Sequence, residues 1–125
     1  GNETILVVED EEKVRNVICM MLRKYGYNVL VAGSGHEAQK IYQEHGKPVN
    51  LLLTDMVMPD MDGLEVIRQI KSRQPDVMVI CMSGYTDKII HKEMQEGMVF
   101  LHKPFSPEDL AREVKSLLDK EDHGG

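Results

Sequence analysis

Four of the five short apolar stretches in this 125-residue chain end in residues that could do chemistry together. Glu9 and Asp10 follow the first stretch, and Asp55, Ser83 and Lys103 follow the third, fourth and fifth. If the stretches are parallel strands, their carboxyl ends meet at one edge, where ligands bind in open α/β sheets. The spacing therefore predicts one site made of three carboxylates, a hydroxyl and an amine.

These residue types favour a site that accepts a phosphoryl group. Three carboxylates close together repel one another, and a hard divalent cation with oxygen ligands relieves that repulsion. Mg²⁺ is expected, because it binds one or two carboxylates and completes its shell with water and phosphate oxygens. Lys103 offers a point charge, and Ser83 a hydroxyl donor, to other phosphate oxygens. Asp55 is the best nucleophile, since a carboxylate can carry a phosphoryl group as an acyl phosphate.

Each of these residues alone has a simpler interpretation. Asp10 could cap the helix after it, and Asp62, with Glu65 three residues later, is more typical of a helix cap than of a ligand. The Ser-Gly pair at 83–84 could be only a tight turn. Asp55 is harder to explain in this way, because a charge directly after an apolar strand costs desolvation unless it is paired. The joint occurrence favours the functional interpretation.

Hydrophobic periodicity predicts the elements that position these residues. Apolar stretches indicate strands at residues 4–8, 27–32, 49–54, 77–82 and 99–102. Helices are expected to start at Ser34, Asp62 and Ser106, and a shorter helix around Ile89 and Met94 is expected to stop at Gly97. The first helix is expected to bury one face formed by Val14, Val17, Ile18, Met21, Leu22 and Tyr25.

Strands that alternate with helices, and that are apolar at successive positions, indicate a parallel sheet covered on both faces. Right-handed crossovers then give a doubly wound, flavodoxin-like (βα)5 fold of the α/β class, with five strands in the order 2-1-3-4-5. We expect one domain over residues 4–119, followed by a polar tail or linker remnant at 120–125.

Composition argues against several other classes of protein. With 15 Lys and Arg against 21 Asp and Glu, the net charge is −6, which disfavours direct binding to nucleic acid. No apolar run is longer than Val77–Met82, which is far shorter than the ~18 residues of a membrane span. Cys19 and Cys81 fit buried positions in a reducing compartment. We therefore expect a cytoplasmic domain without direct membrane contact.

Four segments together resemble the receiver domain of response regulators in two-component signalling. The segments are Ile5–Glu11, Thr54–Gly63, Met82–Thr86 and Lys103–Phe105, and they occur in family order. Two stretches, at 83–86 and 106–110, are slightly more similar to the receivers of hybrid histidine kinases. The resemblance covers residues 4 to 119.

The resemblance implies a role for each matching residue. Asp55 would be the phosphoacceptor, and Lys103 the charge partner of its phosphoryl group. Mg²⁺ would be held by Asp55, Asp10 and the backbone carbonyl of Val57. Glu9 stands where Asp is commoner, and we expect its longer side chain to reach the metal through water.

The resemblance also implies a conformational switch. Ser83 matches the switch hydroxyl, Phe100 matches the switch aromatic, and Tyr85 is an alternative aromatic. Phosphorylation would draw Ser83 and Lys103 inward and remodel the fourth helix, fifth strand and fifth helix. A core role for Phe100 is an equally good interpretation. The Lys103–Pro104 bond is a candidate cis peptide.

Implied partners are a sensor histidine kinase or a histidine phosphotransfer protein, and an output domain or effector of unknown kind. The main alternative is a small phosphatase that forms an aspartyl phosphate. Such enzymes usually carry a second Asp two residues after the nucleophile, where this chain has Val57. A flavin carrier is disfavoured, because acids follow the first strand where its phosphate loop would lie.

Overall fold

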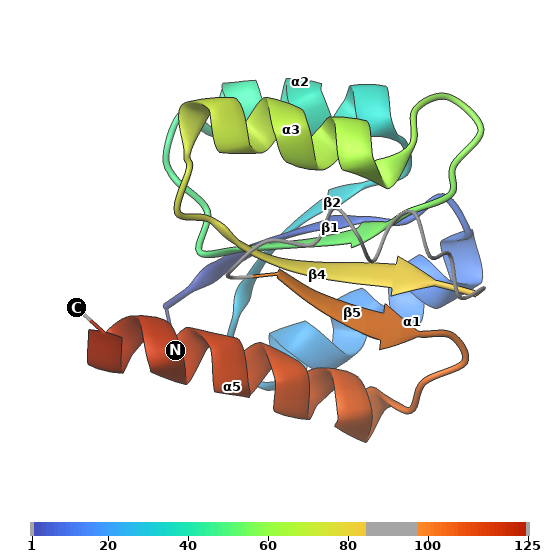
Figure 1. The fold of residues 1–125 in the computed structure, drawn as a ribbon. Coiled ribbons are helices and arrows are strands. Elements are labelled where there is room, and N and C mark those ends of the chain that lie inside the picture. The colour runs from blue at the N-terminus through green and yellow to red at the C-terminus, as the bar shows by residue number, and fades with distance from the viewer. Residues whose placement is uncertain (1, 85–97, 125) are drawn as a thin grey trace.

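The computed structural model describes residues 2–84 and 98–124, so Tyr85 and the helix expected around Ile89 and Met94 lie outside it. Five parallel strands form one sheet in the order β2-β1-β3-β4-β5, as the sequence predicts. Along the chain the described elements are β1 (Thr4–Val8), α1 (Glu12–Lys24), β2 (Asn28–Ala32), α2 (Gly35–His45), β3 (Leu51–Asp55), α3 (Gly63–Arg73), β4 (Met78–Ser83), β5 (Met98–His102) and α5 (Pro107–Gly124). Helices α2 and α3 cover one face of the sheet, and α1 and α5 cover the other (Figure 1).

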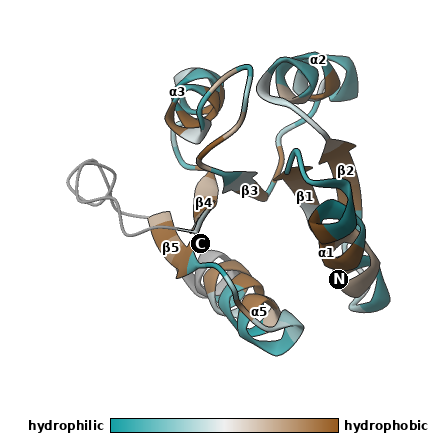
Figure 2. Ribbon diagram, turned by 90° about the vertical axis from the view of Figure 1, so that its right-hand side faces the viewer, coloured by the Kyte–Doolittle hydropathy of each residue, from teal (hydrophilic) through white to brown (hydrophobic). Residues whose placement is uncertain are grey.

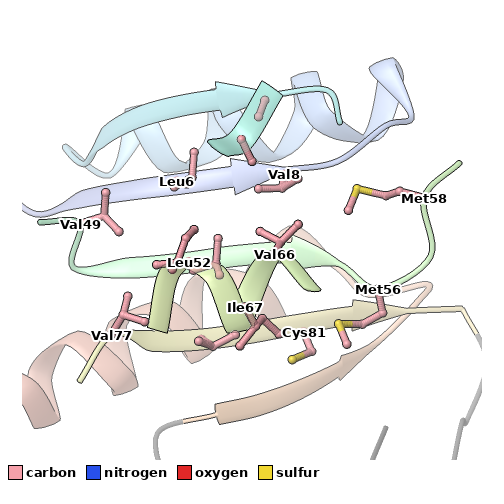
Figure 3. Close-up of a cluster of buried hydrophobic side chains, with 14 residues drawn as sticks. Leu6, Val8, Val49, Leu52, Met56, Met58, Val66, Ile67, Val77 and Cys81 are labelled. Carbon is pink, nitrogen blue, oxygen red and sulfur yellow. The ribbon is translucent and has the colours of Figure 1, made fainter. Parts of the chain in front are cut away.

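The core lies on both faces of the sheet because successive strand residues point in opposite directions. On β1, Leu6 and Val8 belong to the buried cluster beneath α2 and α3 (Figure 3), whereas Ile5 and Val7 belong to the cluster against α1 and α5. Figure 2 accordingly shows strands that are hydrophobic along most of their length and helices that carry hydrophilic residues as well. The predicted burial of Cys81 is also confirmed.

Side-chain caps fix the starts of two helices where the sequence predicts them. The Ser34 hydroxyl accepts a hydrogen bond from the Glu37 N–H, while the Glu37 carboxylate accepts one from the Gly33 N–H. At α5, Ser106 and Asp109 cap each other reciprocally. α5 then runs to Gly124, so the helix continues into the segment that we expected as a polar tail.

Strand limits differ from the predicted ones by one or two residues. Tyr27 is not part of β2, because its N–H donates to the carbonyl of Leu22 in the preceding turn. β3 and β4 include Asp55 and Ser83 as their last residues, so both lie within the hydrogen-bonded sheet.

The predicted buried face of α1 is partly wrong. Val17 is 54% exposed and Tyr25 is 57% exposed, whereas Cys19 is buried beside Ile18 and Leu22. The helix meets the sheet along this narrower stripe, Val17 lines an open groove between α1 and α5, and Tyr25 already lies at the helix end.

Candidate functional site

The strand register places the predicted carboxylates together. Val8 pairs with Thr54, so the residues that follow, Glu9 and Asp55, lie at the same level of the sheet. One carboxylate oxygen from each of Glu9, Asp10 and Asp55 lies within 4.8 Å of the other two. The acidic cluster expected from the strand ends is therefore present at the carboxyl edge of β1 and β3.

Lys103 directly follows β5, an edge strand of the sheet, and its side chain reaches across to this cluster. Its Nζ lies 2.8 Å from Glu9 Oε1 and 3.5 Å from Asp55 Oδ2. The Glu9 side chain is fully buried, and the side chains of Asp55 and Lys103 are 9% and 22% exposed. The amine thus bridges two carboxylates, with the shorter contact to Glu9.

The second oxygen of Glu9 makes the cluster suitable for a metal ion. Glu9 Oε2 is buried and has no hydrogen-bond partner among the described residues. A buried, unpaired carboxylate oxygen is costly, and it faces a neighbourhood that already holds two further carboxylates. An all-oxygen donor set of this kind fits a hard divalent cation.

The pKa values report the same crowding of negative charge. Burial and the nearby Asp55 carboxylate raise the pKa of Glu9 from 4.5 to about 7, although Lys103 opposes the shift. Desolvation and Asp55 also raise the pKa of Asp10. Burial alone lowers the pKa of Lys103, but its contacts with Glu9 and Asp55 raise it overall, so the amine stays charged.

Comparison with known proteins identifies the family. The family model described as "Response regulator receiver domain" matches residues 5–115. This chain is a receiver domain. It therefore belongs to the phosphoacceptor modules of two-component signalling, which pair with histidine kinases and are not classical enzymes. The acidic cluster is consistent with a phosphoacceptor site.

Individual relatives differ in how much of their length the receiver domain covers. It is 40% identical to the sensor kinase CckA of Brucella abortus over 98% of this chain, but spans only 13% of that kinase. The response regulator receiver protein CpdR of the same organism is 34% identical, with 91% of this chain and 95% of CpdR covered. The solved receiver domain of the hybrid histidine kinase CckA is 36% identical, with a TM-score of 0.80 and coverage of 92% of this chain and 98% of that chain.

The other predicted site residues that the structure describes differ in how exposed they are. Ser83 is 2% exposed at the end of β4, beside the strand that carries Asp55. Phe100 is partly buried against the core beneath α2 and α3, and its ring meets the His102 ring edge-on at 5.3 Å. Val57, in the loop after β3, is 68% exposed. Within the described part of the chain, no helix is long and apolar enough to cross a membrane.

The end of the loop after Asp55 packs against the backbone of Asp55 and Met56. The N–H of Gly63 donates to the Met56 carbonyl at 3.0 Å, and a Cβ at Gly63 would clash with the Asp55 carbonyl oxygen. Only glycine allows this approach. Asp62 accepts a hydrogen bond from the Glu65 N–H, which confirms it as the cap of α3.

Two features of the receiver site were not predicted from the sequence. Glu9, expected to act through water, makes the shortest contact with Lys103, because its extra methylene carries the carboxylate across to β5. Arg15, on α1, donates to the Glu9 carbonyl at 3.1 Å and fixes the backbone that carries the acidic pair. Neither contact leaves a sequence signal, because the first joins side chains 94 residues apart and the second uses a backbone carbonyl, which every residue has.

The raised pKa of Glu9 gives a prediction for stability without metal. Between pH 4.5 and about 7 the folded protein holds a proton on Glu9 that the unfolded chain has lost. The contribution of Glu9 to the free energy of unfolding therefore falls as pH rises through this window. In chelator, the Glu9→Gln variant is expected to lose this dependence, a difference of up to a few kcal/mol. Urea unfolding of both proteins at pH 5 and pH 8 measures it. Parallel pH profiles for the two proteins would contradict the assignment.

Proposed function

We propose that this receiver domain takes a phosphoryl group from a phosphohistidine onto Asp55 in a Mg²⁺-dependent reaction. The observation that carries the proposal is the convergence of four charged residues at the ends of three strands. Oxygens of Glu9, Asp10 and Asp55 lie within 4.8 Å of one another, and Lys103 contacts Glu9 and Asp55. The conformation of the β5 and α5 face then changes and signals to an output domain or effector.

The chemistry follows from the groups present. A carboxylate oxygen of Asp55 attacks phosphorus, the P–N bond to the donor histidine breaks, and its electron pair returns to the imidazole. Asp10, Asp55 and the Val57 carbonyl would hold Mg²⁺, with Glu9 Oε2 available to the ion or its water. When bound, Mg²⁺ supplies positive charge to the phosphoryl oxygens and to the acceptor.

Lys103 and Ser83 complete the proposed acceptor site. The Lys103 amine already lies 3.5 Å from Asp55, so a phosphoryl group there offers it new oxygens in place of Glu9. The Ser83 hydroxyl, at the end of the neighbouring strand, donates to another phosphoryl oxygen. We propose that an aromatic side chain responds to these movements, either Phe100 or Tyr85, which lies outside the described residues.

The switch has a direct test in amide spectra. Phosphorylation with acetyl phosphate and Mg²⁺ is expected to shift the resonances of residues 83 and 98–105 by more than those of β2, because β2 lies at the far side of the sheet. Identical spectra of free and phosphorylated protein over residues 83 to 105 would contradict the proposed switch.

An apolar groove supports docking of the donor on α1 and α5. The groove shares Lys103 with the acidic site, and its apolar walls come from both helices and the segment before α5: Val14, Val17, Ile18, Met21, Pro104, Phe105 and Leu110. A helix that carries the donor histidine would seat apolar side chains here and place its phosphoryl group beside Asp55.

Because kinases use ATP and the cysteines are free, we place the domain in the cytoplasm.

One added negative charge can test docking of the protein donor separately from the phosphoryl transfer reaction. Val17→Asp is expected to slow transfer from a phosphohistidine protein about tenfold while phosphorylation by acetyl phosphate is unchanged. Asn16→Asp is the matched control, because it adds the same charge to an exposed position of α1 outside the groove lining. Equal rates for both variants with the protein donor would argue against this docking surface.

A further inference from the structure

Asp60, in the loop between β3 and α3, binds the start of α2. Its Oδ1 accepts a hydrogen bond from the Gly35 N–H at 3.2 Å, and its Oδ2 accepts one from the His36 N–H at 3.0 Å. The His36 ring Nδ1 lies 2.7 Å from the same Oδ2. One carboxylate therefore joins the loop that follows the phosphoacceptor to a helix 24 residues earlier in the chain.

A steric contact holds the same two segments together. A Cβ added at Gly35 would lie 2.7 Å from the Cβ of Met61, so the loop and the first turn of α2 are in close contact. The hydrogen bonds from His36 are the main reason that the pKa of Asp60 lies at about 2. Asp60 is thus an anion whenever the protein is folded near neutral pH, and it satisfies helix N–H groups that would otherwise lack partners.

The other end of this loop is fixed at the site itself. The Met56 N–H donates to the Met82 carbonyl at 2.9 Å, and the Met56 carbonyl accepts from Gly63. Residues 57–59 therefore lie between contacts at Met56 and at Asp60, and Met58 within this stretch is buried in the core beneath α2 and α3. Val57, whose carbonyl is the proposed metal ligand, is the exposed residue between Met56 and the buried Met58.

We propose that Asp60 is a positioning residue for the receiver site: by binding the start of α2 it holds the loop at 57–59 where the Val57 carbonyl can serve Mg²⁺. This inference rests on the proposed function of the site. Asp60 does not itself reach the acidic cluster of Glu9, Asp10 and Asp55. Its effect passes through the loop backbone.

Mg²⁺ dependence of phosphorylation tests the role of Asp60. Asp60→Ala is expected to raise the Mg²⁺ concentration for half-maximal phosphorylation by acetyl phosphate roughly tenfold, as loss of an outer support does in other metal sites. The maximal rate at saturating Mg²⁺ should stay near that of wild type, because no reacting group is removed. Asp60→Asn, which keeps an acceptor oxygen, should lie between the two, and it serves if the alanine variant does not fold.

Asp76→Ala is the matched control, since it removes the same charge from an exposed turn before β4, at the opposite edge of the sheet. A Mg²⁺ requirement unchanged in Asp60→Ala, or changed equally in Asp76→Ala, would overturn the inference. Mg²⁺ titration followed by amide spectra separates it from the proposed function. If Asp60→Ala binds Mg²⁺ more weakly while wild type is not phosphorylated, the positioning role holds and the proposed function is overturned.

Discussion

Replacing Asp55 with asparagine is expected to abolish phosphorylation completely. The amide keeps nearly the same shape but cannot attack phosphorus to form an acyl phosphate. Incubation with acetyl phosphate and Mg²⁺ should give wild type the mass of one added phosphoryl group and leave Asp55→Asn unchanged in intact-protein mass spectrometry. A variant that still gains this mass would show that another residue is the acceptor.

Asp62→Ala provides the control within the same loop. Asp62 caps α3 and is exposed, and it stands outside the acidic cluster formed by the described residues. The variant should lose about 1 kcal/mol of stability, typical of a missing N-cap, and still accept one phosphoryl group. Loss of phosphorylation in both variants would mean that the loop, rather than the Asp55 carboxylate, limits the reaction.

Removal of divalent cations is expected to stop phosphorylation of the wild type just as completely. Glu9, Asp10 and Asp55 hold negative charge within 4.8 Å, and a phosphoryl group adds more, so the donor is repelled unless a cation is present. Reaction with acetyl phosphate in excess chelator should give no mass gain, and added Mg²⁺ should restore it. Full activity in chelator would exclude a metal site.

Substitutions of two adjacent acids, Asp10 and Glu11, test whether the Mg²⁺ dependence arises at the acidic cluster. Asp10→Ala should require more Mg²⁺ than wild type, because it removes a proposed ligand. Glu11→Ala should not, because Glu11 occupies the N-cap position of α1 without a side-chain cap bond and stands outside the cluster. An equal increase in both variants would point to general electrostatic attraction instead of coordination.

The architecture could be predicted because it follows from local patterns. Strands that are apolar at successive positions specify a sheet buried on both faces, and the strand order follows from chain connectivity. The meeting of Asp10, Asp55 and Lys103 at one edge is a direct consequence of parallel strands. The helix starts at Ser34 and Ser106 were also predictable, because a cap hydrogen bond joins residues within four positions of each other.

What the sequence did not reveal depends on contacts between distant segments. Periodicity assigned Val17 to a buried face, because a pattern cannot tell how wide a stripe the neighbouring sheet and helix will cover. The reach of Glu9 to Lys103 depends on the spacing of strands three positions apart in the sheet. Asp60 gave no signal, since two of its partners on α2 are backbone N–H groups, which every sequence contains, and the third is a His36 ring 24 residues away.

The most direct test of the account is to find where the phosphoryl group resides. Borohydride reduction of the phosphorylated protein converts an aspartyl phosphate to homoserine, which peptide mass spectrometry can locate. We predict homoserine at position 55 alone, formed only when Mg²⁺ was present. Homoserine at Asp10 or Asp62, or none at position 55 in a protein that has gained a phosphoryl group, would contradict the assignment.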